Sequence, residues 1–341
     1  MSDSIVVLAH GSGGRMTHEL IRKVFRQHLK SPLLAVQDDA AVWSPSLPEG
    51  ARLAMTTDSY VVQPLFFPGG DIGRLAVCGT VNDLAMVGAR PLYLSCGFIL
   101  EEGLALADLE RVVQSMAGTA AEAGVEIITG DTKVVDRGSA GGEGLFINTA
   151  GVGVVPSGIS LSGDNARPGD RVILSGPIGL HGLAIMTLRE GLRFSLPLES
   201  DCAPLNGLVE AMLEASPRIH CLRDPTRGGL ATTMNEIAAQ SKVGVELDEE
   251  SIPVPEGVRA ACELLGLDPL YAANEGKLIA IVPPEVEEIV LGAMRGHRLG
   301  QQAVSVGRVV SDHAGRVVLA TAMGAHRILD MLSGAMLPRI C

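Results

Sequence analysis

The stretch 156-PSGISLSGDNARPGD-170 divides the chain into two parts. It is rich in glycine, proline, serine and aspartate, which favour turns and interrupt helices and strands. The sequence on both sides of it mixes strand-like alternation with helical periodicity. We therefore predict two α+β domains, 1–155 and 166–332, followed by a tail at 333–341.

The same patterns predict the order of elements in each half. Before the linker we expect strands at 52–56, 92–100, 125–129 and 145–155, and helices at 16–29, 71–87 and 106–123. After it we expect strands at 171–175, 243–247 and 278–282, and helices at 203–215, 229–239, 255–265 and 284–294. Segments 303–310 and 316–320 are typical of a hairpin, and 325–332 of a short last helix.

The composition excludes several classes of protein. A length of 341 residues suits about two domains, and 47% hydrophobic residues argue against disorder. A net charge of −12 provides no basic surface for nucleic acid. The chain has no apolar run as long as the ~18 residues of a membrane span and no signal-peptide pattern after Met1. Its six cysteines form no C-x-x-C pair, so we expect a cytoplasmic protein with reduced thiols.

Three aspartates in the first half suggest a magnesium site. Asp39 belongs to an acidic pair beside an apolar segment, Asp58 ends a strand-like run, and Asp83 lies on an otherwise apolar or small helix face. Mg²⁺ prefers carboxylate oxygens, and a carboxylate on an apolar face is costly unless it is paired or bound to metal. A solvated turn, a helix cap or a hydrogen-bonded buried aspartate is the alternative.

Two further motifs combine acids with cations. Asp131, Thr132 and Lys133 follow a predicted strand, where Asp131 suits a metal and Lys133 suits a phosphate or, if desolvated, acts as a base. Asp224 and Arg227 precede two glycines at the start of a predicted helix, a position that favours anions. A surface salt bridge and a well-capped helix are the respective alternatives.

Three more positions belong to the candidate set. Gly13 and Gly14 lie in a glycine-rich segment whose backbone N–H groups suit a phosphate, although the segment lacks the spacing of a Walker A loop. A flexible arm is the alternative for this segment. Glu275 lies between a predicted helix and a predicted strand and is a candidate base.

Cys341 is a candidate nucleophile at the end of the tail. Residues 333–341, at ~3.3 Å per residue, can reach about 30 Å and could carry a thiol from one site to another. The thiolate is the nucleophilic form of cysteine. The neighbouring terminal carboxylate opposes ionisation of the thiol, and Arg339 offsets that effect. A cysteine that stands there by chance is the alternative.

Taken together, these motifs resemble the HypE family of hydrogenase maturation factors, the carbamoyl dehydratases of nickel–iron hydrogenase assembly. The acidic motifs alone indicate only the wider aminoimidazole ribonucleotide synthetase-like, or PurM-like, superfamily, and the terminal Pro338-Arg339-Ile340-Cys341 is the most specific piece. The resemblance covers nearly the whole chain and includes His10-Gly11-Ser12-Gly13-Gly14, Asp38-Asp39-Ala40-Ala41-Val42, Thr57-Asp58, Asn82-Asp83-Leu84-Ala85, Gly130-Asp131-Thr132-Lys133, Asp224-Pro225-Thr226-Arg227-Gly228-Gly229 and Asn274-Glu275-Gly276.

The resemblance implies a fold, a reaction and partners. The fold is an N-terminal α/β domain and a C-terminal α+β domain, and family members dimerise through N-terminal sheets that form a shared barrel, with ATP near that interface. The carbamoyltransferase HypF loads a carbamoyl group on the Cys341 sulfur, ATP activates its oxygen, and loss of water leaves a thiocyanate. The cyano group passes to iron on a HypC–HypD scaffold.

The resemblance also implies a role for each candidate residue. Cys341 carries the substrate, and Lys133 and Glu275 deprotonate and position it. Binding of Mg²⁺ and of the ATP phosphates is assigned to Asp39, Asp58, Asp83, Asp131 and Asp224. Binding of ATP is also assigned to Thr132, Arg227, Gly13 and Gly14.

Two other functions stay open at this point. A selenophosphate synthetase or thiamine monophosphate kinase would share the architecture, but the former carries a reactive cysteine in the N-terminal glycine-rich segment, whereas the first cysteine here is Cys78. A small-molecule kinase would not need Cys341. A non-enzymatic carrier that presents Cys341 would not hydrolyse ATP.

Overall fold

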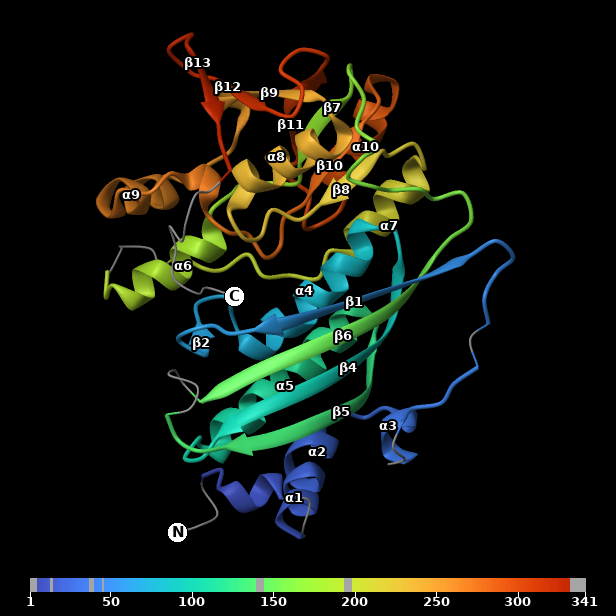
Figure 1. Cartoon of the computed structure of the whole chain (residues 1–341), viewed down its shortest axis with the longest axis vertical. Helices are drawn as coiled ribbons and strands as arrows, with labels where there is room; N and C mark the ends of the chain where they lie inside the picture. Colours follow the sequence, from blue (N-terminus) through green and yellow to red (C-terminus); the bar gives the residue numbers. More distant parts are fainter. Residues whose placement is uncertain are drawn as a thin grey trace.

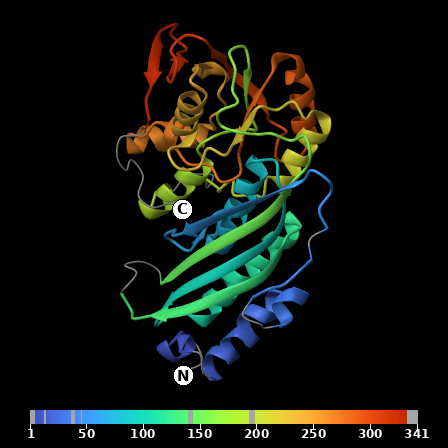
Figure 2. The same ribbon diagram turned by 45° about the vertical axis from the view of Figure 1, so that its right-hand side comes forward.

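The computed structural model describes residues 5–12, 15–36, 40–44, 46–138, 144–192 and 198–331, without the side chain of Val36. The described elements form two halves, an N-terminal one below and a C-terminal one above in Figure 2. In the described part of the chain, no helix combines the length and the apolar character needed to cross a membrane.

The N-terminal half is a four-stranded sheet with two long helices on one face (Figure 1). The helices are α4 (Ile72–Met86) and α5 (Leu106–Ala123), and α5 connects the two parallel strands β4 and β5. The remaining neighbours pair antiparallel. In spatial order the strands are β1 (Arg52–Tyr60), β6 (Leu145–Val155), β4 (Arg90–Glu101) and β5 (Glu126–Val135).

Helix α4 is the centre of the N-terminal half. Asp71 caps its first turn, because the Asp71 carboxylate accepts the N–H groups of Gly73 at 2.7 Å and Arg74 at 3.1 Å. Nearly every side chain of the helix is buried, and Asp83 is one of the few that are not. A helix that is apolar all round is expected at the centre of a fold rather than at its surface.

Short helices at the N-terminus extend the core beyond β5. Phe25 packs edge-on against Phe98 of β4 with ring centroids 4.8 Å apart. A two-stranded ribbon, β2 and β3, leads into α4. These elements are η1 (Leu8–Gly11), α1 (Arg15–Leu20), η2 (Ile21–Phe25), α2 (Arg26–His28), α3 (Pro32–Val36), β2 (Phe66–Phe67) and β3 (Gly70–Asp71).

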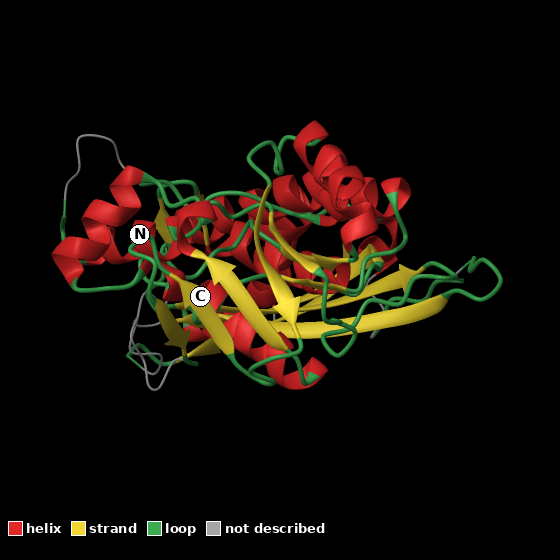
Figure 3. Cartoon of the chain, turned by 90° about the horizontal axis from the view of Figure 1, so that it is seen from above, coloured by secondary structure: helices red, strands yellow, loops and turns green. Residues whose placement is uncertain are grey.

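In the part of the chain that the structure describes, the second face of the N-terminal sheet is largely uncovered. In the view from above, most helices lie on one side of its long strands (Figure 3). Leu53, Met55 and Ile99 point from the uncovered side and are 58%, 75% and 46% exposed. Alternation along β1 therefore leaves large apolar side chains in solvent, which is typical of a surface that a partner covers.

The C-terminal half is a seven-stranded mixed sheet with helices on both faces. Alternating residues of β7 show the two layers: Ile173 packs with α7 and α10, whereas Val172 and Leu174 pack with α8. In spatial order the strands are β13 (His326–Leu329), β12 (Val317–Ala320), β9 (Gly244–Asp248), β11 (Val304–Val310), β7 (Arg171–Leu174), β10 (Ile279–Val282) and β8 (Cys221–Arg223). The helices are α6 (Leu180–Arg189), α7 (Asn206–Ala215), α8 (Gly229–Ser241), α9 (Glu256–Leu265) and α10 (Glu287–Gly296), with η3 (Glu249–Ser251), η4 (Pro269–Tyr271) and η5 (Pro284–Val286) between them.

The structure corrects several sequence-based expectations. The expected last helix at 325–332 is the edge strand β13, because pairing with β12 and burial of Leu329 outweigh local helical periodicity. The expected hairpin is wrong, since β9 lies between β11 and β12. Strands β1 and β5 continue through Asp58 and Lys133, so these motifs lie within the sheet and not in loops after it. Helix α6 and strand β8 were not expected.

The two halves are joined by hydrogen bonds as well as apolar packing. Asn82 of α4 is buried, and its Oδ1 accepts the Leu205 N–H at 2.7 Å. Its Nδ2 donates to the carbonyl oxygens of Ala203 at 3.2 Å and Glu275 at 3.4 Å. Asn82 therefore fixes two segments of the C-terminal half to the central helix of the N-terminal half.

We predict that Asn82→Ala destabilises the protein by about 2 kcal/mol or more, because each buried polar group that loses its partner costs about 1–3 kcal/mol. Urea unfolding measures the change in the free energy of unfolding. Asn165→Ala is the control, since Asn165 donates to the Ser160 carbonyl oxygen at the surface. Equal small losses in the two variants would contradict a joining role for Asn82.

Candidate functional site

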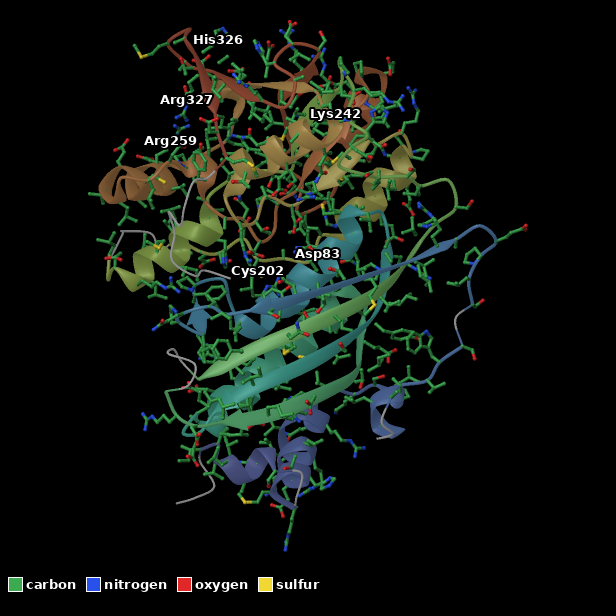
Figure 4. All side chains as sticks on the ribbon, in the orientation of Figure 1. Asp83, Cys202, Lys242, Arg259, His326 and Arg327 are labelled. Carbon is green, nitrogen blue, oxygen red and sulfur yellow. The ribbon has the colours of Figure 1, made fainter. Side chains whose placement is uncertain are left out.

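Acidic side chains from both halves meet at the joint. Asp58 lies on β1, and Asp83 lies on α4. Figure 4 labels Asp83 at the joint. Asp224 follows β8, and Glu275 lies between η4 and β10. Burial is the main cause of the raised pKa of Glu275, and the charges of Asp224 and Asp58 add to it, so these groups lie within electrostatic reach of Glu275.

Hydrogen bonds to Asn274 hold the Asp224 loop beside Glu275. The Asn274 Nδ2 and backbone N–H donate to the Pro225 carbonyl oxygen at 2.9 and 3.1 Å. Its Oδ1 accepts the Gly179 N–H at 2.7 Å. Asn274 is fully buried, and its hydrogen bonds connect these loops to one another.

Burial and mutual repulsion raise the pKa values of these acids. Burial raises the pKa of Asp224 to about 7, and the charges of Asp83 and Asp58 add to the effect. Burial and Asp58 also raise the pKa of Asp83, although a hydrogen bond of 2.8 Å from Thr56 Oγ1 opposes them. Burial raises the pKa of Glu275 well above its ordinary value, and Cys202 and the neighbouring acids contribute.

A cavity of about 610 Å³ opens beside Asp83 and Asp224. Arg223 and Arg227 line it as well, and Arg223 pairs with Glu236 at its rim. The cavity thus offers cationic groups for phosphate next to carboxylates that carry excess negative charge. Its wall also includes Thr56, Thr226, Thr233, Glu236 and Gln240.

The carboxylates fit a cation in charge but do not form a complete binding site by themselves. Among the described residues, no three acidic, histidine or cysteine side chains come close enough together to bind a metal. Burial is the main cause of the raised pKa values of Asp83 and Asp224, and mutual repulsion adds to it, so a cation between them would favour their ionised forms. Mg²⁺ commonly takes one or two carboxylates and completes its shell with water and substrate phosphates, and this donor set suits that arrangement.

A second, smaller hollow of about 300 Å³ lies between the N-terminal helices and β5. Asp131 and Thr132 line it, together with Ala40, Ala41 and Arg26. The hollow borders the predicted nucleotide segments, but Asp39, Gly13 and Gly14 themselves lie outside the described residues. Cys341 and the tail 333–341 also lie outside them.

Asp131 and Lys133 are separated from Glu275 within one chain. They form an exposed ion pair of 3.2 Å on β5, at the edge of the sheet opposite β1. Asp131 is in register with Gly97 and, through β6, with Ser59, which is three strand spacings or about 14 Å away. One copy therefore brings Asp58, Asp83, Asp224 and Glu275 together, but not Asp131 and Lys133.

Sequence reasoning missed two residues that fix the site. Asp201 and Lys277 form a buried ion pair of 3.2 Å next to Glu275. Lys277 follows Glu275 by two positions, and a lysine beside a candidate base was a signal that could have been used. Asp201 belongs to no recognisable motif, and only the folded chain reveals its position.

The comparisons with known proteins agree with this architecture. Models of AIR synthase related proteins match residues 37–155 as the N-terminal domain and residues 167–320 as the C-terminal domain. The carbamoyl dehydratase HypE of Azotobacter vinelandii is 59% identical over 336 residues, covering 98% of this chain and 97% of that protein.

Two solved structures extend the comparison. A hydrogenase maturation protein HypE in complex with ATP superposes with a TM-score of 0.93 at 54% identity, covering 98% of this chain and 99% of that one. A chain of a HypE–HypF complex superposes with a TM-score of 0.80 at 47% identity, covering 92% and 99%. The predicted family and the two-domain PurM-like fold are thereby confirmed.

We predict that Asp224→Asn stabilises the protein at high pH. A folded pKa of about 7, against about 3.9 in an unfolded chain, gives stability that is present below pH 4 and lost as the pH rises through 7. Asparagine does not ionise, so the variant does not lose stability in this way. Its free energy of unfolding should exceed that of the wild type by about 1–3 kcal/mol at pH 8, and the difference should disappear near pH 4.

Urea unfolding at several pH values, in EDTA and without nucleotide, measures this difference. Asp312→Asn, at an exposed position, should follow the wild type at every pH. A gap between Asp224→Asn and wild type that does not change with pH would contradict a buried, repelled charge at Asp224.

Proposed function

The chain belongs to the HypE family, and on this basis we propose that it removes water from a carbamoyl group on the Cys341 sulfur with the use of ATP. It is an ATP-dependent carbamoyl dehydratase of hydrogenase maturation, as its 59% identity to a relative of that name over nearly the whole chain supports. The structural observation that carries the proposal is the meeting of Asp83, Asp224 and Glu275 beside a cavity with two arginines.

The reaction removes one oxygen and two protons from the substrate. The carbamoyl oxygen attacks the γ-phosphorus of ATP and displaces ADP, so a poor leaving group becomes a phosphate. Loss of the two nitrogen-bound protons, one in each step, and of inorganic phosphate then converts S–C(=O)–NH₂ into S–C≡N. The enzyme must therefore bind polyphosphate, hold the carbamoyl group in line with it and accept protons.

Asp58, Asp83 and Asp224 at the joint would hold Mg²⁺. Asp39, which lies outside the described residues, and Asp131, which lies on β5 at the opposite edge of the sheet, keep the Mg²⁺ assignment that the sequence suggested. The cation would offset the charge of the phosphates and of these carboxylates. Arg227 lines the cavity and is the proposed contact for phosphate oxygens. We assign Thr132, Gly13 and Gly14 to the nucleotide as well, because Thr132 lines the second hollow.

Glu275 is the proposed proton acceptor within this site. Burial raises its pKa well above the ordinary value, and positive charge near the site would lower that pKa toward the working pH, where a carboxylate can accept a proton. Lys133 is the second proposed residue for proton removal and substrate positioning. Because it lies on the open sheet face of β5, its participation requires surfaces beyond the joint of its own chain.

A homodimer provides such a surface. The open face of the N-terminal sheet carries exposed Leu53, Met55 and Ile99, and Asp131 and Lys133 lie on that face too. We propose that two copies pack through these faces and form the shared barrel, with ATP near the interface. HypF, which is present in the HypE–HypF complex, is the proposed carbamoyl donor, and a HypC–HypD complex the proposed cyanide acceptor.

We retain residues 1–155, 166–332 and 333–341 as the proposed domain and tail boundaries. The cytoplasm is the proposed compartment, in keeping with the free and buried state of all five described cysteines.

We predict that intact mass of the C-terminal peptide reveals the reaction. After incubation with HypF, carbamoyl phosphate, ATP and Mg²⁺, wild-type protein should gain one carbamoyl group and then lose one water, and Cys341→Ala should gain nothing. Glu275→Gln should accumulate the carbamoyl adduct. If Cys341 stays unmodified while ATP is consumed, the chain acts on a free small molecule instead.

We predict that Ile99→Glu converts a dimer into a monomer, because a charge on the open sheet face is buried without a partner in the dimer. Sedimentation equilibrium measures the change. Ile289→Glu is the matched control, since Ile289 is 52% exposed on α10 of the C-terminal half, away from the open face of the N-terminal sheet. A dimer that survives Ile99→Glu would place the interface elsewhere.

A further inference from the structure

The Glu275 carboxylate depends on its backbone for its position. In the part of the chain that the structure describes, no hydrogen bond to this carboxylate is formed, although the side chain is only 4% exposed. A base must lie within hydrogen-bond reach of the proton that it accepts. The groups that hold the Glu275 backbone therefore decide where its carboxylate points.

Asp201 and the segment that follows it hold that backbone at both ends. Asp201 Oδ1 accepts the Glu275 N–H at 3.1 Å. The Glu275 carbonyl oxygen accepts the Ala203 N–H at 3.2 Å and Asn82 Nδ2 at 3.4 Å. A Cβ at Gly276 would overlap the carbonyl oxygen of Asp201, so glycine is required for this close approach.

Lys277 makes the buried Asp201 tolerable. The two side chains form an ion pair of 3.2 Å, and they are only 11% and 2% exposed. Lys277 Nζ also donates to the Gly276 carbonyl oxygen at 3.1 Å. A buried carboxylate without a partner charge is strongly disfavoured, so the Lys277 ammonium compensates the charge of Asp201 beside the Glu275 backbone.

The surrounding contacts anchor Asp201 itself. The preceding Ser200 donates its N–H to the Pro68 carbonyl oxygen at 2.8 Å, and its Oγ accepts the Cys202 N–H at 3.1 Å. Arg74 of α4 donates to the Cys202 carbonyl oxygen at 2.8 Å. Cys202 is labelled near Asp83 in Figure 4, at the same joint of the two halves.

We propose that Asp201, kept in place by Lys277, is a positioning residue that aims Glu275 at the carbamoyl group of the tail. This proposal rests on the proposed function of Glu275. Asp201 acts as a hydrogen-bond acceptor, because its Oδ1 lies at a fixed point beside the Glu275 N–H. The charge of Lys277 compensates the buried charge of the Asp201 carboxylate.

The test compares two neutral replacements of the pair. Asp201→Asn with Lys277→Met keeps an acceptor oxygen at position 201, whereas Asp201→Leu with Lys277→Met has nearly the same shape but no acceptor. Neither double variant leaves an unpaired buried charge. If the Leu variant does not fold, Asp201→Ala takes its place in the same comparison.

Single-turnover dehydration is the measurement. Cys341 is carbamoylated chemically with cyanate, which makes the test independent of HypF, and the C-terminal peptide is weighed at intervals after ATP and Mg²⁺ are added. ATP affinity and Tm are measured in parallel. Glu246→Leu with Arg308→Met removes a pair at the surface of the C-terminal half as a control for loss of charge.

The Asn variant should recover nearly the wild-type rate, and the Leu variant should be about 10–100-fold slower at unchanged ATP affinity and matched Tm. Equal rates in the two double variants would overturn the proposal, because the acceptor would then be dispensable. Slow rates in both would also overturn it, since the charges and not the acceptor would be required. A wild-type rate in Glu275→Gln would instead show that the proposed role of Glu275 is wrong.

Discussion

The polar joint around Asn82 is the constraint on which the rest of the structure depends. Asn82 projects from a helix that is buried on nearly all sides and bonds to the backbone of Leu205, Ala203 and Glu275. A buried amide must satisfy its hydrogen bonds, so these contacts favour the observed arrangement of the two halves. That arrangement brings Asp83 and Glu275, far apart in the sequence, to the same joint.

The clustering of acidic residues at the site is electrostatically unfavourable, and the same clustering gives them their reactivity. Asp58, Asp83, Asp224 and Glu275 repel one another, and burial adds to the effect. A sequence selected for stability alone would not place them together, and such strain is common where a protein binds cations or transfers protons. The surrounding scaffold offsets part of the cost through the hydrogen-bonded Asn274 and the Asp201–Lys277 ion pair.

The second constraint is the uncovered face of the N-terminal sheet. A sheet normally buries one face against helices, and here α4 and α5 cover one side only. The other side combines exposed apolar residues with the Asp131–Lys133 pair. A single chain thus separates residues that the proposed chemistry requires together. Association of two copies through this face would bring such residues together.

The sequence by itself determined the two-domain division, most helices, the family and the list of candidate residues, because turn chemistry, periodicity and short motifs are local properties. It did not determine that 326–329 is an edge strand or that β9 separates β11 from β12, since strand pairing depends on distant partners. Only the tertiary structure decided which acids meet, how far Lys133 lies from Glu275 and that Asp201 holds the Glu275 backbone. These are contacts between segments up to about two hundred residues apart, and no local pattern encodes a distance between them.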